Sequence, residues 1–286
     1  MTGRLQLWFA VAAGAVTLTA WQPSHAQEAT SVPTGLTLRP FAAAFAGDGT
    51  NARVRIAIDV TEPSSQIADS AGRVSEDLIC DIAAVDLATG QTSASTSRAV
   101  RLIGGARGVP REIVTLDVDA MLTLVPGKYE LQADAKSRSG TRSGRALLAL
   151  DVPDFSAQPL QVSDLVLGSG GNPRGWSGSR IVTGGAPPIW PFHPEISREF
   201  PSTDDVRLYA EIARANPASR VDASAEILDR AGKIVVQRTP TIAAGAPGAI
   251  DVTLTLAWLA PGPYRLRVTA KDGAHTAARE VEFVVK

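Results

Sequence analysis

Leu124-Val125-Pro126-Gly127-Lys128-Tyr129-Glu130-Leu131 returns 135 positions later as Leu259-Ala260-Pro261-Gly262-Pro263-Tyr264-Arg265-Leu266, and Ala-Lys follows a few residues after both copies. Pro-Gly followed by alternating apolar residues is typical of a turn that leads into a β-strand. A phrase repeated at this spacing indicates two copies of one domain. Several apolar, strand-like segments also correspond in order between the two halves, so the sequence predicts an internal duplication.

The periodicity of the chain predicts strands throughout. Arg53 to Val60 alternates polar and apolar residues strictly, and Val206 to Ile212 is its counterpart in the second half. No segment of ten residues has a helical face, although Asp119 to Leu124 and Ala257 to Leu259 could form single helical turns. The predicted fold class is all-β, with two tandem immunoglobulin- or fibronectin-like β-sandwich domains after a signal peptide. Tyr129 and Tyr264 are expected to fix the loop before each Pro-Gly strand through their hydroxyl groups.

Proline and glycine mark the expected boundaries. Pro153 ends a strand because it has no backbone N–H for the ladder. The stretch 168–194 is rich in Gly, Pro and Trp without periodicity, which indicates a long loop. The predicted organisation is a signal peptide (1–26), a disordered leader (27–37), a first sandwich (38–153), a linker (154–159) and a second sandwich (160–286) that carries the loop 168–194.

The N-terminus has the pattern of a secretory signal. Arg4 precedes an apolar stretch, and Ser24-His25-Ala26 predicts cleavage before Gln27. The alternative is an uncleaved membrane anchor. The apolar stretch is short for this role, since a span needs about 20 apolar residues. We therefore expect a periplasmic or secreted bacterial protein without stable membrane insertion after cleavage. The single Cys80 excludes an intrachain disulfide, and its apolar surroundings predict a buried core residue.

Charge is balanced, with 28 Lys and Arg against 29 Asp and Glu. Because no basic cluster is present to neutralise phosphates, nucleic acid is not an expected partner. The expected partner is another exported or cell-envelope protein.

Known catalytic and metal-binding patterns are missing from the sequence. It has no Gly-x-Ser-x-Gly elbow and no His or Cys pair at metal spacing. His193 and His275 both lie in predicted loops or turns. We therefore predict no enzyme activity, no catalytic residue, no metal ligand and no cofactor.

The aromatic residues of the loop 168–194 are the candidate partner-binding site. Trp176, Trp190, Phe192 and His193 all lie in this loop. Loop aromatics at the end of a sandwich often bind partners. The alternative is that they fold back and fill the groove between the domains, because a loop of this length usually needs packing of its own.

Five short phrases support a family resemblance over about residues 40–286. They are Pro126 to Leu131, Val152-Pro153-Asp154-Phe155-Ser156, Leu165-Val166-Leu167, Ser197-Arg198-Glu199-Phe200 and Ala260 to Leu266. In this order they resemble the tandem sandwich region of bacterial, acidobacterial-type VWFA-related proteins, without the A-type domain. The metal-binding Asp-x-Ser-x-Ser motif of the A-type domain does not occur, so the resemblance transfers no functional residue.

The function predicted from the sequence is that of an exported, non-enzymatic binding or assembly module of two Ig-like domains, whose ligand the sequence does not name. The alternatives are a hydrolase or a protease-inhibitor-like module that uses the loop 168–194, with His193 as the base of the hydrolase.

Overall fold

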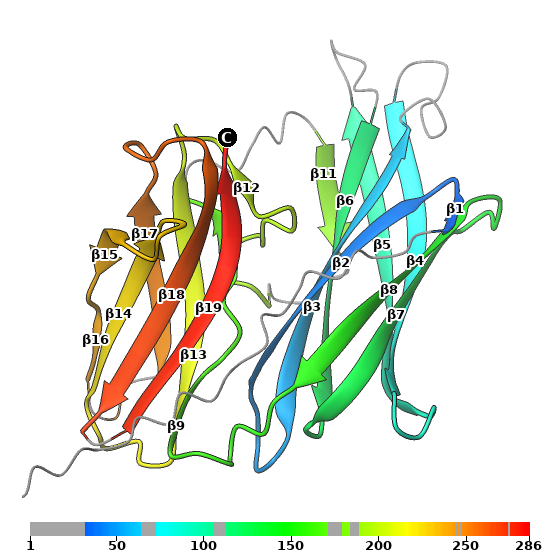
Figure 1. Ribbon diagram of the computed structural model, residues 1–286. Helices are drawn as coiled ribbons and strands as arrows, with labels where there is room; N and C mark the ends of the chain where they lie inside the picture. The colour runs from blue at the N-terminus through cyan, green and yellow to red at the C-terminus, as the bar shows by residue number, and fades with distance from the viewer. Residues whose placement is uncertain are drawn as a thin grey trace, which may run out of the picture.

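Figure 1 shows the protein as a computed structural model, which describes residues 32–63, 73–105, 113–170, 179–183, 189–243, 245, 248–273 and 275–286. Within these residues the chain is all-β, and none of them forms a helix that could cross a membrane. The predicted signal peptide lies outside them. The strands of the first half are β1 (Val32–Thr34), β2 (Thr37–Ala46), β3 (Ala52–Pro63), β4 (Arg73–Asp86), β5 (Thr92–Gly105), β6 (Ile113–Leu124), β7 (Gly127–Ser137) and β8 (Ser143–Val152).

The strands of the second half are shorter on average. They are β9 (Leu160–Val162), β10 (Val166–Ser169), β11 (Ser179–Thr183), β12 (Glu199–Phe200), β13 (Asp205–Arg214), β14 (Val221–Leu228), β15 (Ile234–Arg238), β16 (Thr241–Ile242), β17 (Ala249–Thr255), β18 (Gly262–Asp272) and β19 (His275–Val285).

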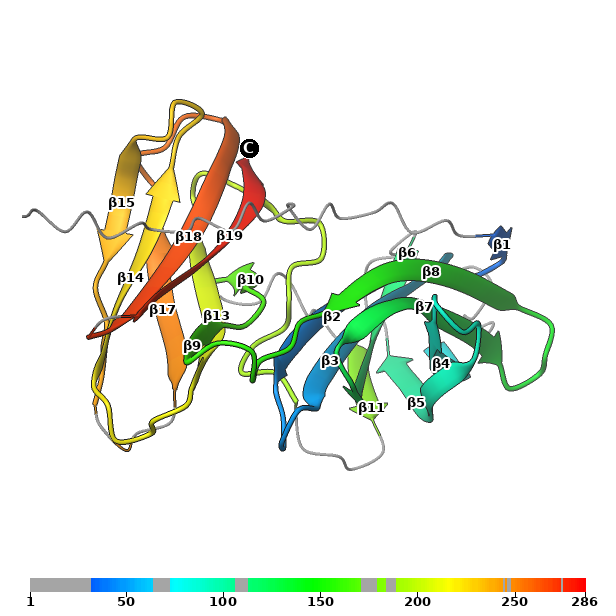
Figure 2. The same cartoon turned by 60° about the horizontal axis from the view of Figure 1, so that its bottom comes forward.

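Two β-sandwiches lie side by side (Figures 1 and 2). In the first, the sheet β1-β8-β7-β4-β5-β11 faces the sheet β2-β3-β6. In the second, the sheet β12-β19-β18-β14-β15, with β16 beside β14, faces the sheet β10-β13-β17, with β9 beside β13. Each pair of sheets encloses its own apolar core.

The two sandwiches repeat one topology, as the duplicated sequence predicts. The order β2-β3-β6 corresponds to β9/β10-β13-β17, and β8-β7-β4-β5 corresponds to β19-β18-β14-β15. The expected tyrosine contacts are confirmed in both copies. The Tyr129 hydroxyl donates to the Val125 carbonyl at 2.9 Å, and the Tyr264 hydroxyl donates to the Ala260 carbonyl at 2.9 Å.

Alternation along β3 explains how one strand serves both the core and the outer surface. Val54, Ile56 and Ile58 point inward and are fully buried. Successive side chains of a strand point to opposite faces, so Arg55 and Asp59 lie on the outer face. This outer face of β2-β3-β6 is the side of the first sandwich that meets the second one.

The structure corrects two expectations for the first sandwich. The leader was predicted to be disordered through residue 37, but β1 pairs with β8 and Leu36 is fully buried. Residues 32–37 therefore belong to the first sandwich. No helical turn forms at 119–124, because these residues continue β6 in its pairing with β3.

The second half also differs from its expected organisation. The single strand expected at 160–167 is broken between β9 and β10 at Ser163-Asp164-Leu165. Within the stretch predicted as a loop, 168–194, β11 pairs antiparallel with β5 and so extends a sheet of the first sandwich. One strand of the second half is thus part of the first sandwich, where it is the edge strand next to β5, and Figure 1 draws it beside β6.

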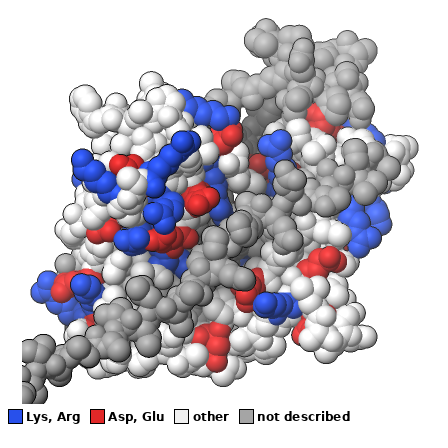
Figure 3. Space-filling model, viewed as in Figure 1, with Lys and Arg blue, Asp and Glu red and all other residues white. Residues whose placement is uncertain are grey.

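Charges of both signs are interspersed over the face of the second sandwich in Figure 3. Cross-strand ion pairs contribute to this pattern, such as Arg267 of β18 with Glu280 of β19 at 2.5 Å. This mixture agrees with the balanced charge of the sequence.

Candidate functional site at the domain junction

A third apolar cluster joins the two sandwiches. It combines Ala43, Phe45 and Ala57 of β2 and β3 with Val166 and Trp190 of the second half. The Trp190 ring lies 5.8 Å from the ring of Phe41 and 6.3 Å from that of Phe45, between centroids. Trp190 is only 6% exposed. Aromatic pairs at such distances add stabilisation beyond the area they bury.

Ion pairs surround this apolar cluster. Glu211 of β13 accepts hydrogen bonds from Arg53 at 2.8 Å and from Arg55 at 2.6 Å, both from β3. The Arg55 guanidinium also lies 4.3 Å from the centre of the Phe45 ring and 5.5 Å from that of Tyr209. One basic side chain therefore links both sandwiches through a carboxylate and two aromatic faces.

The break between β9 and β10 forms a second link to the first sandwich. The Asp164 carboxylate accepts a hydrogen bond from the Ala44 N–H at 2.8 Å, and the Asp164 N–H donates to the Ala44 carbonyl at 3.2 Å. Arg279 pairs with the same carboxylate. The strand is broken here because the backbone and side chain of Asp164 form hydrogen bonds with β2 instead of continuing the ladder of their own sheet.

The segment after Trp190 is held against β10. The Glu195 N–H donates to the Leu167 carbonyl at 2.7 Å. A Cβ on Gly168 would lie 2.4 Å from the Phe192 ring and 2.8 Å from the His193 carbonyl oxygen, so only glycine permits this close approach. Gly168 thereby allows the His193 backbone to lie against β10.

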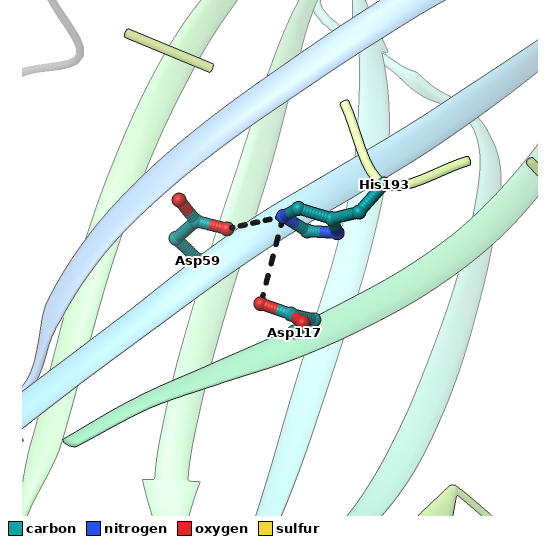
Figure 4. Close-up of side chains that lie close together, drawn as sticks. All are labelled: Asp59, Asp117 and His193. Carbon is teal, nitrogen blue, oxygen red and sulfur yellow. Dashed lines mark ion pairs between the residues drawn. The ribbon is translucent and has the colours of Figure 1, made fainter. Parts of the chain in front are cut away.

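His193 reaches two aspartates on the outer face of the first sandwich (Figure 4). Asp59 of β3 and Asp117 of β6 are directly opposite each other in the strand register. The His193 Nε2 atom lies 3.5 Å from Asp59 Oδ1 and 3.7 Å from Asp117 Oδ1. The three donor atoms all lie within 4.8 Å of one another, so together they could hold a metal ion.

The electrostatics of this cluster follow from burial and crowding of like charges. Burial, with the neighbouring charges of Asp59 and Asp119, raises the pKa of Asp117 to about 6, although His193 opposes the shift. Burial alone would lower the pKa of His193, but the contact with Asp59 and the charges of Asp117 and Asp119 outweigh it, so this pKa is raised. The pKa values of Asp117 and His193 are thus both higher than they would be in solvent.

Asp119 extends the acidic cluster along β6. It lies two residues beyond Asp117 on the same face of β6. Burial raises its pKa, and the charge of His193 opposes this shift. Among the described residues, Asp119 Oδ1 and Trp190 Nε1 are both buried atoms without a hydrogen-bond partner. Asp119 thus adds a third carboxylate whose charge acts on His193.

The predicted partner-binding residues lie in different environments in the structure. Trp190 is buried and packs between the sandwiches, as the packing alternative proposed. Phe192 is half-buried beside it, with the Arg207 guanidinium 4.9 Å from its ring centre. His193 remains 42% exposed in its side chain. Trp176 lies outside the described residues. The structure brings Trp190, Phe192 and His193 together at the junction, but not as an exposed aromatic surface.

Sequence reasoning missed the two aspartates and an exposed tryptophan. Asp59 and Asp117 occupy outward positions of alternating strands, which the sequence does show, but the pairing of β3 with β6 and the approach of His193 depend on tertiary structure. Trp258 lies between β17 and β18 and is 88% exposed. Its place in a turn before Pro-Gly was the available signal.

Comparisons with known proteins assign no family and no function to the chain. No protein-family model and no curated protein matches the chain. Among solved structures, red sea bream transglutaminase is similar at 10% identity and a TM-score of 0.23, over 87% of this chain and 31% of that one. The β-glucuronidase of Parabacteroides merdae is similar at 10% identity and a TM-score of 0.27, over 81% of this chain and 28% of that one. The chain thus spans about a third of the length of each.

Proposed function

We propose that this protein is an exported, non-enzymatic binding or assembly module in which two Ig-like domains are held in one fixed orientation. The set of contacts at the junction is the observation that carries the proposal. Domains that share a small polar interface usually move against each other. Here an apolar cluster, the ion pairs of Glu211 and the backbone link at Asp164 all connect the sandwiches. Such a connection suits a protein that presents two surfaces at a set spacing.

The Ig-like assignment is supported by topology. In the part common to both copies, three strand positions of the smaller sheet face four strands of the larger one, as in fibronectin-type and immunoglobulin-type domains, and β1, β11, β12 and β16 extend the larger sheets. In those domains a tyrosine near the start of the next-to-last strand bonds backbone upstream of it. Tyr129 and Tyr264 have this position and this bond. The resemblance to the sandwich region of VWFA-related proteins agrees with this assignment and stays part of the proposal.

The most suitable partner contact among the described residues is Trp258. Exposed tryptophans are rare, and tryptophan is enriched among the residues that contribute most to protein–protein binding. The expected partner is another exported or cell-envelope protein, since the N-terminal sequence predicts export.

A photo-crosslinking experiment in the producing cells tests this function. A photoreactive phenylalanine analogue at position 258 should give a discrete adduct with an envelope protein, and the same analogue at exposed position 88 of the first sandwich serves as the control. Equal labelling at both positions would argue against a partner site at Trp258. N-terminal sequencing of the exported protein should begin at Gln27.

A hydrolase remains the second candidate because of one observation, the raised pKa values of Asp117 and His193 at a half-exposed position. With its pKa raised to about 6, Asp117 can exchange protons near neutral pH. If the purified protein turns over peptide, ester, glycoside or phosphate substrates and both His193→Ala and Asp117→Asn abolish this turnover, the protein is an enzyme and the non-enzymatic proposal fails.

A further inference from the structure

We propose that Asp59, Asp117 and His193 bind a first-row divalent cation of the Zn²⁺ class, which ties the two sandwiches together at their junction. Two ligands come from strands of the first sandwich and the third from a segment of the second half. This site goes beyond the proposed binding function and does not depend on any partner.

The distances fit ligands around a metal better than they fit hydrogen bonds. Zinc binds histidine nitrogen and carboxylate oxygen at about 2.0–2.2 Å, so neighbouring ligand atoms of a tetrahedral site lie roughly 3.4 Å apart. The observed separations of 3.5 and 3.7 Å from His193 Nε2 are close to this value. A charge-assisted hydrogen bond between the same groups would be about 2.7–2.9 Å long.

The negative charge of the two aspartates is also poorly compensated by the residues around them. Asp59 Oδ1 is a buried atom without a hydrogen-bond partner, and like charges directly opposite each other on paired strands repel. Among the described residues, His193 is the residue with which Asp59 and Asp117 form ion pairs. Arg39, the cross-strand neighbour of Asp59 on β2, is exposed. By contrast, Glu211 at the same junction has two arginine partners.

The donor set selects the class of cation. Ca²⁺ takes oxygen ligands, whereas an imidazole nitrogen combined with carboxylates suits Zn²⁺ and similar first-row ions. Three protein ligands leave at least one position for water or for the nearby Asp119 carboxylate. The exposed part of the His193 side chain gives the ion a route from solvent.

The surrounding residues hold the ligands in place before an ion arrives. Gly168 permits the close approach of the His193 backbone to β10, and Trp190, three residues before His193, is buried in the apolar cluster of the junction. Supporting contacts of this kind usually change metal affinity when they are removed. Because a ligand that binds only the folded state stabilises it, the ion should raise the thermal stability of the junction.

Calorimetry on the tag-free mature protein, stripped with a chelator, tests the site with ZnCl₂ as the probe. We expect one Zn²⁺ per chain and a higher melting temperature, while CaCl₂ gives neither. His193→Ala and Asp117→Asn should each weaken Zn²⁺ binding by at least about ten-fold. The matched controls, His275→Ala and Asp151→Asn at exposed positions, should bind as the parent does.

Circular dichroism should show that both site variants are folded, and Co²⁺ absorption gives a second readout. Co²⁺ should produce visible bands in the parent protein that His193→Ala removes. The proposal is overturned if the parent does not bind Zn²⁺, or if folded His193→Ala and Asp117→Asn bind it as tightly as the controls do. Neither result would alter the crosslinking at position 258, so the two proposals fail separately.

Discussion

Trp190 and Trp258 have opposite environments, with 6% and 88% of their surface exposed. We expect Trp190→Ala to lower the free energy of unfolding by about 3–5 kcal/mol, because truncating a buried aromatic leaves a cavity. Trp258→Ala should change it by less than about 0.5 kcal/mol, because an exposed side chain loses little burial. Denaturant titration of both variants compares them directly. Equal effects of the two substitutions would contradict the packing role of Trp190.

Cys80 gives a second prediction from a single residue. It is fully buried on β4, and burial, with the charges of Asp81 and Asp134, raises the pKa of its thiol to about 12. Only a minute fraction of the thiol is then ionised at pH 8, and the thiolate is the reactive form. Iodoacetamide should leave the native protein unmodified and label it fully in denaturant, as mass spectrometry would show. Rapid modification of the native protein would contradict this burial.

At the level of elements, the hydroxyl group of a tyrosine stabilises the loop at each Pro-Gly turn through a hydrogen bond. Tyr129→Phe removes the hydrogen bond to Val125 and should lower the free energy of unfolding by about 0.5–1.5 kcal/mol. Tyr264→Phe should cost less, because its bond to Ala260 is exposed and water can replace it. Thermal unfolding of the two variants tests this order. If Tyr264→Phe is the more destabilising change, the hydroxyl contacts do not act as described.

Most strands could be predicted because their alternation is local. β3 alternates polar and apolar residues from Arg53 to Val60 apart from Ala57, and its inward residues are buried as expected. The break at Asp164 could not be predicted, because its cause is a bond to Ala44 of the other sandwich. β11 contains the β-branched run Ile181-Val182-Thr183, a weak strand signal that Gly and Pro on both sides obscured.

The candidate site was predictable only in part, for the same reason. His193 stood out from the sequence because few histidines occur and because aromatic residues surround it. Asp59 and Asp117 join it only through the register of β3 with β6 and the position of a distant segment. Side chains that meet through tertiary structure leave no spacing pattern in the chain.

For the whole molecule, we predict that residues 27–156 and 157–286 each fold alone. Each fragment contains one enclosed core of its own. Both should be soluble β-proteins by circular dichroism, since about 130 residues are enough for a sandwich. Both should also melt below the full chain, because the fragments lose the junction and the first loses β11. If neither fragment folds while the full chain does, the division into two folding units is wrong.

The fixed orientation of the two sandwiches is the central claim, and electron–electron double resonance measures it most directly. Spin labels on Ala88→Cys and Ala231→Cys, exposed in turns of the first and second sandwich, report the distance between them, while buried Cys80 stays unlabelled. We predict one narrow distance distribution in the parent chain and a broad one after Trp190→Ala, which removes the aromatic centre of the junction. A broad distribution in the parent chain, unchanged by Trp190→Ala, would contradict a fixed junction.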